Sequence, residues 1–164
     1  ELKLEDFFSP DYLYEFFSEL YGIPTDRRDA RKRMLFARFG IQEFAQVRVR
    51  DLSTGMKQKV SLVISLGQDP EIIIFDEPTN GLDILTAKVV TDCLLDLKEQ
   101  GKTIIISTHI FSLVEKLCDR VGIIINGRMA ACEDLRTLCG DKSLEDRFFE
   151  IYEAVNGEDE NHDK

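Results

Sequence analysis

Two short runs of aliphatic residues constrain most strongly what this chain can fold into. One is Ile72–Phe75 and the other is Thr103–Ile106. Continuous apolar runs of about four to eight residues are typical of strands buried on both faces of a parallel sheet. A helix is predicted between them, over residues 84–100, and Gly101 ends it. This order of strand, helix and strand predicts an α/β fold.

The part of the chain before these runs is predicted to be mostly helical. Ser9 is a suitable N-cap and Pro10 a suitable first residue for one amphipathic helix. A second helix is predicted over residues 25–39, capped by Thr25, and Ser53 is positioned to cap a third. We therefore expect a helical subdomain over residues 1–68.

The C-terminal part is predicted to continue the α/β layer. A short helix follows the second apolar run, and Asn126-Gly127 between two apolar segments is a strong β-hairpin signal. A final helix is predicted over residues 143–154. The predicted organisation is a helical part (1–68), a part that holds the sheet (69–155) and an acidic loose tail without apolar residues (156–164).

Composition argues against two classes of protein. The 164 residues include 21 basic and 31 acidic side chains, for a formal net charge of −10, whereas a protein that coats nucleic acid needs a basic excess. No window approaches the roughly 20 apolar residues that cross a bilayer. The four cysteines lack the spacing of a zinc site. We therefore predict no nucleic-acid partner and no membrane-spanning segment.

Two adjacent acids, Asp76 and Glu77, follow the first apolar run directly. Open α/β sheets bind ligands at the C-terminal ends of their strands. Neighbouring residues there point in different directions, so one carboxylate can hold Mg²⁺ while the other orients or deprotonates a water molecule. The ordinary alternative is a pair of solvated acids at the end of a strand.

Further motifs lie on both sides of the acid pair. Leu52-Ser53-Thr54-Gly55-Met56-Lys57-Gln58 precedes it, Asn80-Gly81-Leu82-Asp83 follows it, and Ser107-Thr108-His109 follows the second run. A helix that begins after Ser53 offers free backbone N–H groups to an anion, although a plain N-cap is the more common role for such a serine. His109 is either a polar loop residue or a functional one.

Together these motifs, in this order and at these separations, resemble the nucleotide-binding domain of the ABC ATPase family. LSTGMKQKV is similar to the signature motif, IIIFDE to the Walker B strand, NGLD to the D-loop and STH to the switch-histidine loop. The resemblance implies a P-loop NTPase-like parallel sheet, present in part, with an α-helical subdomain at the N-terminal end. The Met-Lys-Gln variant of the signature is similar to those of exporter-type ATPases.

The resemblance also implies roles for individual residues. Glu77 would be the catalytic base, Asp76 the magnesium carboxylate, and His109 a contact of the γ-phosphate. The residues implied in nucleotide binding, partly across a dimer interface, are Ser53, Thr54, Gly55, Gln58 and Asp83. The sequence departs from the usual signature at Thr54 and Met56, where glycine and glutamine are common. Methionine cannot hydrogen-bond a ribose.

The function implied is that of an ATP-binding and ATP-hydrolysing subunit of an ABC transporter, with ATP and Mg²⁺ as cofactors. Its partners would be a second ATPase subunit, identical or not, and an integral membrane permease, on the inner face of the cell membrane. The basic helix over residues 27–38 would face the permease, or is a solvated helix face. The alternatives are a soluble non-transport ABC ATPase and a naturally truncated, non-catalytic partner subunit.

One motif of the family is missing from these 164 residues. No GxxxxGK[ST] phosphate-binding loop occurs, since Gly101-Lys102-Thr103 has Asp96 where that loop needs glycine. We expect the chain to be a C-terminal fragment without the Walker A and Q-loop part. We therefore expect it to be inactive alone and to expose an apolar edge on the strand 72–75.

Overall fold

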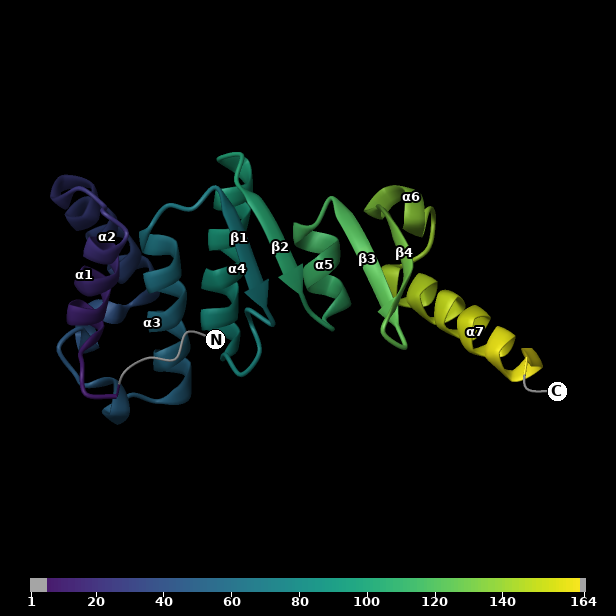
Figure 1. The fold of residues 1–164 in the computed structure, drawn as a ribbon, viewed down its shortest axis with the longest axis horizontal. Coiled ribbons are helices and arrows are strands. Elements are labelled where there is room, and N and C mark those ends of the chain that lie inside the picture. Colours follow the sequence, from purple (N-terminus) through teal and green to yellow (C-terminus); the bar gives the residue numbers. More distant parts are fainter. Residues whose placement is uncertain (1–5, 163–164) are drawn as a thin grey trace. The chain divides into compact units, whose positions relative to one another are not determined.

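The structure of the chain, a computed structural model, describes residues 6–162, with side chains described up to residue 157 (Figure 1). The described chain packs as two compact units, the first ending at Ser107 and the second beginning at Thr108. None of the described helices combines the length and the apolar character needed to cross a membrane.

The first unit holds the helical part and a parallel strand pair. Its elements are α1 (Pro10–Leu20), α2 (Thr25–Phe39), the 3₁₀ turns η1 (Ile41–Phe44) and η2 (Val49–Asp51), α3 (Thr54–Gly67), β1 (Ile72–Asp76), α4 (Ile84–Glu99) and β2 (Thr103–Ser107). The predicted α/β class and the predicted helices are therefore confirmed. One cap differs: Pro24, not Thr25, is the N-cap of α2, without a side-chain hydrogen bond.

The three N-terminal helices pack around a shared apolar core. The Ser9 hydroxyl accepts the Tyr12 N–H and begins α1 as predicted. The ring of Tyr14 is buried against the edge of Phe36, with ring centroids 5.5 Å apart. Both α1 and α2 pack on α3. The buried residues that the three helices share include Leu13, Leu35, Phe39, Val60, Val63 and Ile64.

Ion pairs of the basic helix α2 join the helical part to the strand-bearing part. The Arg31 guanidinium donates to the Leu66 carbonyl at 2.8 Å and lies 3.1 Å from the Asp69 carboxylate. Arg38 pairs with Asp96 of α4 at 2.6 Å. Residues on the two sides of the boundary predicted at residue 68 thus pack together within the first unit.

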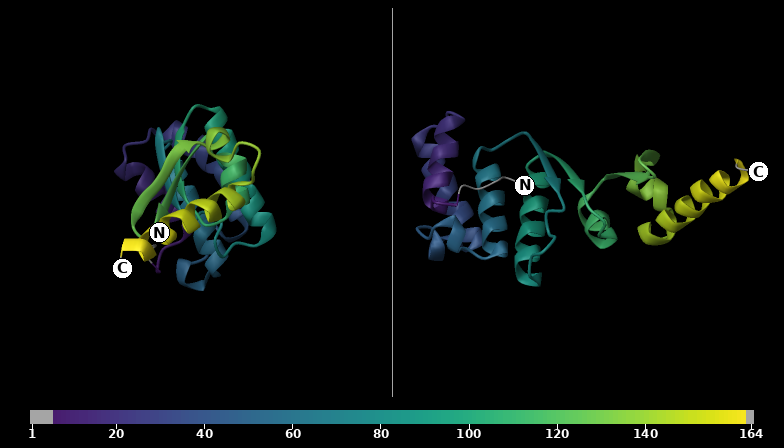
Figure 2. Two further views of the ribbon diagram at one scale, coloured as in Figure 1. Left: turned by 90° about the vertical axis from the view of Figure 1, so that its right-hand side faces the viewer. Right: turned by 60° about the horizontal axis from the view of Figure 1, so that its bottom comes forward.

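The strands β1 and β2 are parallel neighbours, paired from Ile72 opposite Thr103 to Asp76 opposite Ser107. Figures 1 and 2 show α4 lying along this pair, and α4 contacts β2. Within the described residues β1 pairs with β2 alone, so the expected unpaired edge is present.

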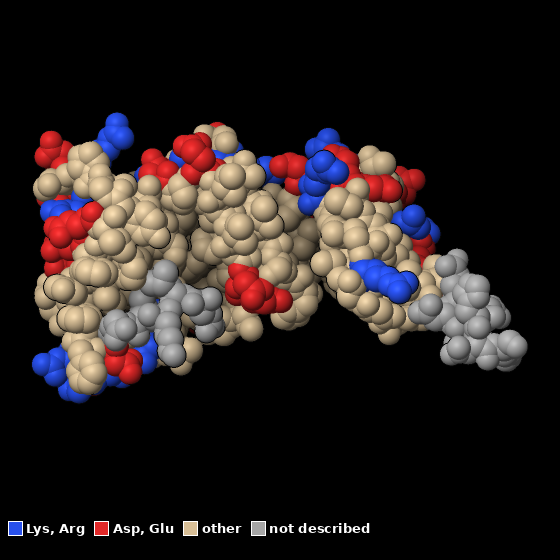
Figure 3. Space-filling model, viewed as in Figure 1, with Lys and Arg blue, Asp and Glu red and all other residues tan. Residues whose placement is uncertain are grey.

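The two strands are not buried on both faces, contrary to the prediction. Ile73 is 5% exposed, whereas Ile72 and Ile74 are 61% and 72% exposed and Ile105 is 53% exposed. Side chains alternate along a strand, and in this unit the described residues bury one face only. On the side of the first unit seen in Figure 3, uncharged side chains cover most of the middle and charged ones gather near the rims.

The second unit is a hairpin packed with three helices: α5 (Phe111–Leu117), β3 (Arg120–Ile125), β4 (Arg128–Asp134), α6 (Leu135–Cys139) and α7 (Leu144–His162). The predicted turn is confirmed, because Asn126 and Gly127 both have positive φ, at 51° and 75°. The short α6 was not predicted. Asp134 caps it by accepting two backbone N–H groups.

The last helix is longer than predicted. Residues 156–162 continue α7 instead of forming a loose tail, and residues 163–164 of the predicted tail lie outside the described residues. The Asn126 amide in the hairpin turn donates to the Asn156 side-chain oxygen at 3.1 Å. This contact ties α7 to the turn beyond the predicted end of the helix, and no proline follows to stop it.

Close packing against the Tyr14 ring leaves no room for a side chain at Gly67 unless the ring moves. A Cβ at Gly67 would lie 2.5 Å from the Tyr14 ring, whereas a Cβ at Gly55 would meet nothing within 4 Å. We predict that Gly67→Ala lowers the free energy of unfolding by about 1–3 kcal/mol through overpacking. Gly55→Ala, the control on the same helix, leaves it unchanged or raises it. Urea unfolding of both variants checks this, and equal stability would contradict it.

Candidate functional site

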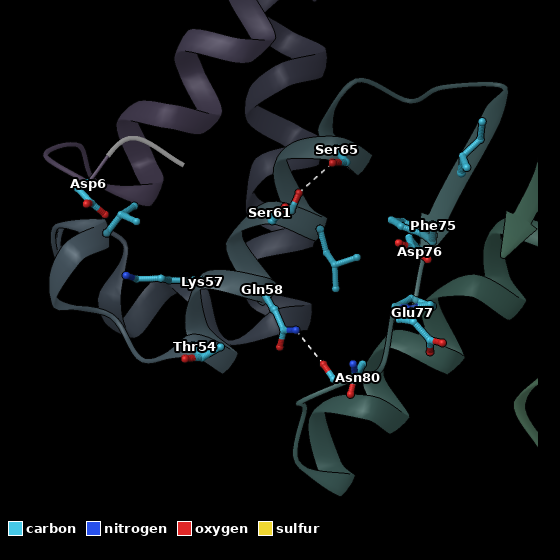
Figure 4. Close-up of a pocket in the computed structure, with 14 residues that line it drawn as sticks. Asp6, Thr54, Lys57, Gln58, Ser61, Ser65, Phe75, Asp76, Glu77 and Asn80 are labelled. Carbon is cyan, nitrogen blue, oxygen red and sulfur yellow. Dashed lines mark hydrogen bonds between the residues drawn. The ribbon is translucent and has the colours of Figure 1, made fainter. Parts of the chain in front are cut away.

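A pocket of about 550 Å³ opens in the first unit between α3 and the end of β1 (Figure 4). The helix side contributes polar side chains that recur at helical spacing: Thr54, Lys57, Gln58, Ser61 and Ser65. The strand side contributes β1 from Ile74 onward and the loop that follows it. The predicted signature segment and the predicted acid pair therefore face the same pocket.

The acid pair lies at the C-terminal end of β1, as predicted. Asp76 is the last residue of the strand, is exposed and lines the pocket. Its carboxylate accepts a hydrogen bond from the Ser107 hydroxyl of β2. Magnesium is typically held by one or two carboxylates together with waters and phosphates. An exposed carboxylate at this place fits a magnesium–nucleotide complex.

Glu77 adopts a backbone conformation that is rare for a non-glycine residue, with φ of 44°. Left-handed backbone costs roughly 1–2 kcal/mol. Two hydrogen bonds hold it: the Glu77 N–H donates to the Ser107 carbonyl at 2.9 Å, and the Asn80 N–H donates to the Glu77 carbonyl at 3.0 Å. The chain turns sharply here, and Figure 4 shows the Glu77 side chain pointing away from α3. The acids thus have different surroundings, and strain of this kind is common at functional sites.

The signature segment forms the beginning of α3. The Ser53 hydroxyl accepts the Met56 N–H at 3.3 Å, so Ser53 is the N-cap. Thr54 is exposed. Around Gly55 the space is open, because a Cβ there would meet no atom within 4 Å. The first backbone N–H groups of α3 can therefore be approached by an anion, and their binding of phosphate stays a prediction.

Gln58 joins the signature helix to the loop after β1. Its side-chain amide donates to the Asn80 carbonyl at 2.8 Å, next to Gly81, whose φ is 71°. Gln58 therefore lies at the pocket but binds protein backbone through its amide N–H, and its role toward a nucleotide stays a prediction. Lys57 is the single cationic side chain among the described lining residues. The sequence analysis did not predict Lys57 as a site residue, although its spacing from Thr54 places both side chains on one face of a helix.

Asp83 is the N-cap of α4. Its carboxylate accepts the Thr86 N–H at 3.0 Å and the Thr86 hydroxyl at 2.7 Å. The pKa of Asp83 is held below its usual value mainly by the hydrogen bond from the Thr86 hydroxyl and, after it, by the bond from the Thr86 N–H. The next residues, Ile84 and Leu85, are 88% and 77% exposed. Asp83 thus has a structural role in the chain, and its contact with a second subunit stays a prediction.

His109 belongs to the second unit, two residues after β2, and its side chain is exposed. The preceding Thr108 hydroxyl accepts the Ile110 N–H at 3.2 Å, which fixes the turn into α5. Among the described residues, no cluster of three or more imidazole, thiol or carboxylate groups can hold a metal by itself.

The Asp83 cap makes the stability of the chain depend on pH in a defined direction. Asp83→Ala lowers the melting temperature at neutral pH because α4 loses its cap. The pKa of Asp83 is lower in the folded state than in the unfolded state. The stabilisation by the charged Asp83 cap is therefore complete above the unfolded-state pKa, and it is lost as the pH falls through the folded-state pKa. We predict that the difference in melting temperature between wild type and Asp83→Ala narrows below about pH 4.

Circular dichroism at a series of pH values measures this difference. Asp83→Asn is the matched control, because it keeps a capping oxygen without the charge. It should melt above Asp83→Ala at neutral pH. A difference between wild type and Asp83→Ala that stays constant down to about pH 2 would contradict the assignment.

Comparisons with known proteins agree with the motifs and the fold. Residues 4–80 match the ABC transporter family. The ABC transporter ATP-binding protein NatA of Bacillus subtilis is 39% identical over 132 residues, which cover 80% of this chain and 54% of that protein. A fluoroquinolones export ATP-binding protein of Mycobacterium tuberculosis is 37% identical over 118 residues, covering 72% of this chain and 38% of that protein.

A solved structure of the ATP-binding subunit of an ABC transporter superimposes with a TM-score of 0.86 at 27% identity, covering 91% of this chain and 64% of that one. The chain spans about half the length, or less, of the curated relatives that it matches. The partial P-loop NTPase-like fold expected from the motifs is thereby confirmed. In both sequence and fold, the chain thus matches a part of the ATP-binding proteins of ABC transporters.

Proposed function

We propose that this chain is the signature and Walker B part of an ATP-hydrolysing subunit that drives an ABC transporter. The observation that carries the proposal is that the exposed Asp76 ends β1, with Glu77 next along the chain, while the N-terminus of α3 is open around Gly55. Acids at a strand end serve a magnesium nucleotide, and a helix N-terminus serves a phosphate. Export, rather than import, is favoured by the exporter-like signature and by the fluoroquinolones export relative.

Each residue has a defined task in this proposal. Asp76 holds the magnesium side of the nucleotide, where the bound cation offsets phosphate charge. Glu77 orients the attacking water and accepts its proton. His109 contacts the γ-phosphate, and the beginning of α3 contacts the nucleotide of the opposite subunit. ATP thus closes two subunits on each other, and hydrolysis lets them reopen.

The activity is proposed for the complete ATP-binding subunit. The 164 residues contain no GxxxxGK[ST] loop, and without its backbone N–H groups and lysine, little offsets the repulsion between phosphate and the acid pair. The phosphate-binding loop would come from sequence outside these residues. We therefore propose that the chain alone does not bind Mg-ATP appreciably.

The proposed partners are a second ATPase subunit and an integral membrane permease, at the inner face of the cell membrane. We propose the permease contact for α1 in place of α2, which the sequence suggested. The basic residues Arg28, Arg31, Lys32 and Arg38 of α2 are engaged in ion pairs with acids of this chain. In contrast, Tyr12 and Phe16 of α1, together with Phe8 just before this helix, form an exposed aromatic stripe.

The aromatic stripe is built to meet an apolar partner. The rings of Phe8 and Tyr12 stack with centroids 4.6 Å apart, and Phe16 continues the stack at 6.3 Å from Tyr12. The three side chains are 41–48% exposed. Large aromatic side chains on a protein surface are enriched at protein interfaces. We place the cytoplasmic helices of the permease on this stripe.

The hydrolysis proposal is tested by Glu77→Gln in the complete subunit. We expect kcat for ATP to fall about 100-fold or more, because the amide cannot accept the proton, with Mg-ATP affinity retained. Phosphate release measures the rate and calorimetry the affinity. Glu99→Gln, at the exposed end of α4, is the control and keeps full activity. The 164-residue chain is the negative control for binding, and micromolar affinity there would contradict the proposed need for the missing loop.

The permease contact is tested by Phe16→Glu in the complete transporter. A buried charge in an apolar interface is costly, so we expect affinity for the permease to fall about ten-fold or more. The control is Phe149→Glu on α7, because Phe149 is 51% exposed and Phe16 is 47% exposed. Copurification from detergent and ATPase stimulation by the permease are measured. Equal effects of the two variants would contradict the assignment of this surface.

A further inference from the structure

Ser107, the last residue of β2, contacts both acids of the pair. It lies opposite Asp76 in the parallel register. Its side-chain hydroxyl donates to the Asp76 carboxylate, and its main-chain carbonyl accepts the Glu77 N–H at 2.9 Å. One residue of the neighbouring strand therefore contacts two adjacent candidate site residues through two different groups.

The two contacts have separable consequences. The main-chain bond helps to hold Glu77 at its positive φ, and it does not depend on the side chain of residue 107. The hydroxyl bond acts on Asp76 alone. Asp76 is exposed at the end of its strand, where a short carboxylate samples several rotamers unless a donor selects one. A hydroxyl on the next strand, directly opposite in register, supplies that donor.

We propose that Ser107 is a positioning residue for the acid pair, whose hydroxyl keeps the Asp76 carboxylate in one rotamer. The inference rests on the proposed function, in which Asp76 binds the magnesium side of the nucleotide. Holding Asp76 in one rotamer would preorganise it for that task. A positioned carboxylate needs no reorganisation when the reaction begins. Ser107 itself touches no reacting atom in this scheme.

The restraint is tested first without nucleotide, in the 164-residue chain. Three-bond couplings of the Asp76 carboxyl carbon to its own backbone nitrogen and carbonyl carbon report its χ1 rotamer by NMR. Wild type and Ser107→Thr, which keeps a hydroxyl, should show one rotamer, and Ser107→Ala should show averaged couplings. Thr103→Ala removes a hydroxyl from the other end of β2 and is the control. A single Asp76 rotamer in Ser107→Ala would overturn the proposal.

The consequence for turnover is tested in the complete subunit. Ser107→Ala should lower kcat about ten-fold while KM for Mg-ATP changes less than about two-fold, and Ser107→Thr should restore kcat. If the wild type is active and Ser107→Ala has the same kcat, the inference is overturned. It is also overturned if kcat of Ser107→Thr is as low as that of Ser107→Ala. If the complete wild-type subunit hydrolyses no ATP, the proposed function is overturned instead. The catalytic purpose of the Ser107–Asp76 contact is then overturned as well.

Discussion

Parallel pairing of β1 with β2 is the interaction on which the rest of the site depends. The register sets Asp76 opposite Ser107. Glu77, which follows β1, has a left-handed backbone and donates its N–H to the carbonyl of the same Ser107. Parallel strands end at the same edge of a sheet, so residues from two distant segments meet there. A slip of one residue would turn Asp76 to the other face and lose its hydroxyl contact.

The signature helix is tied to this strand pair by few but well-defined contacts. The Gln58 amide spans from α3 to the Asn80 carbonyl in the loop after β1. In addition, Arg31 and Arg38 of α2 pair with Asp69 and Asp96 of the strand-bearing part. These contacts keep the beginning of α3 and the acid pair on one pocket, so the helical part belongs to the same compact unit as the strands.

Much of the fold and of the candidate site was readable from local patterns. The Ser9 and Ser53 caps and the Asn126-Gly127 turn are signals confined to a few residues, and each is confirmed. Where distant contacts decide, local patterns failed: residues 156–162 continue a helix that Asn126 helps to anchor. The aliphatic runs predicted strands correctly but not their burial, since burial depends on which layers pack against each face.

The sequence by itself predicted the class of fold and the resemblance to ABC ATPases, and it marked Asp76 and Glu77 as candidate site residues, because these follow from periodicity and from motifs at fixed spacing. Tertiary structure alone decided that Ser107 holds Asp76, that Lys57 and Gln58 line the same pocket, and that the arginines of α2 are engaged within the chain. Contacts between residues 30 or more positions apart depend on strand register and helix packing, which no local pattern encodes.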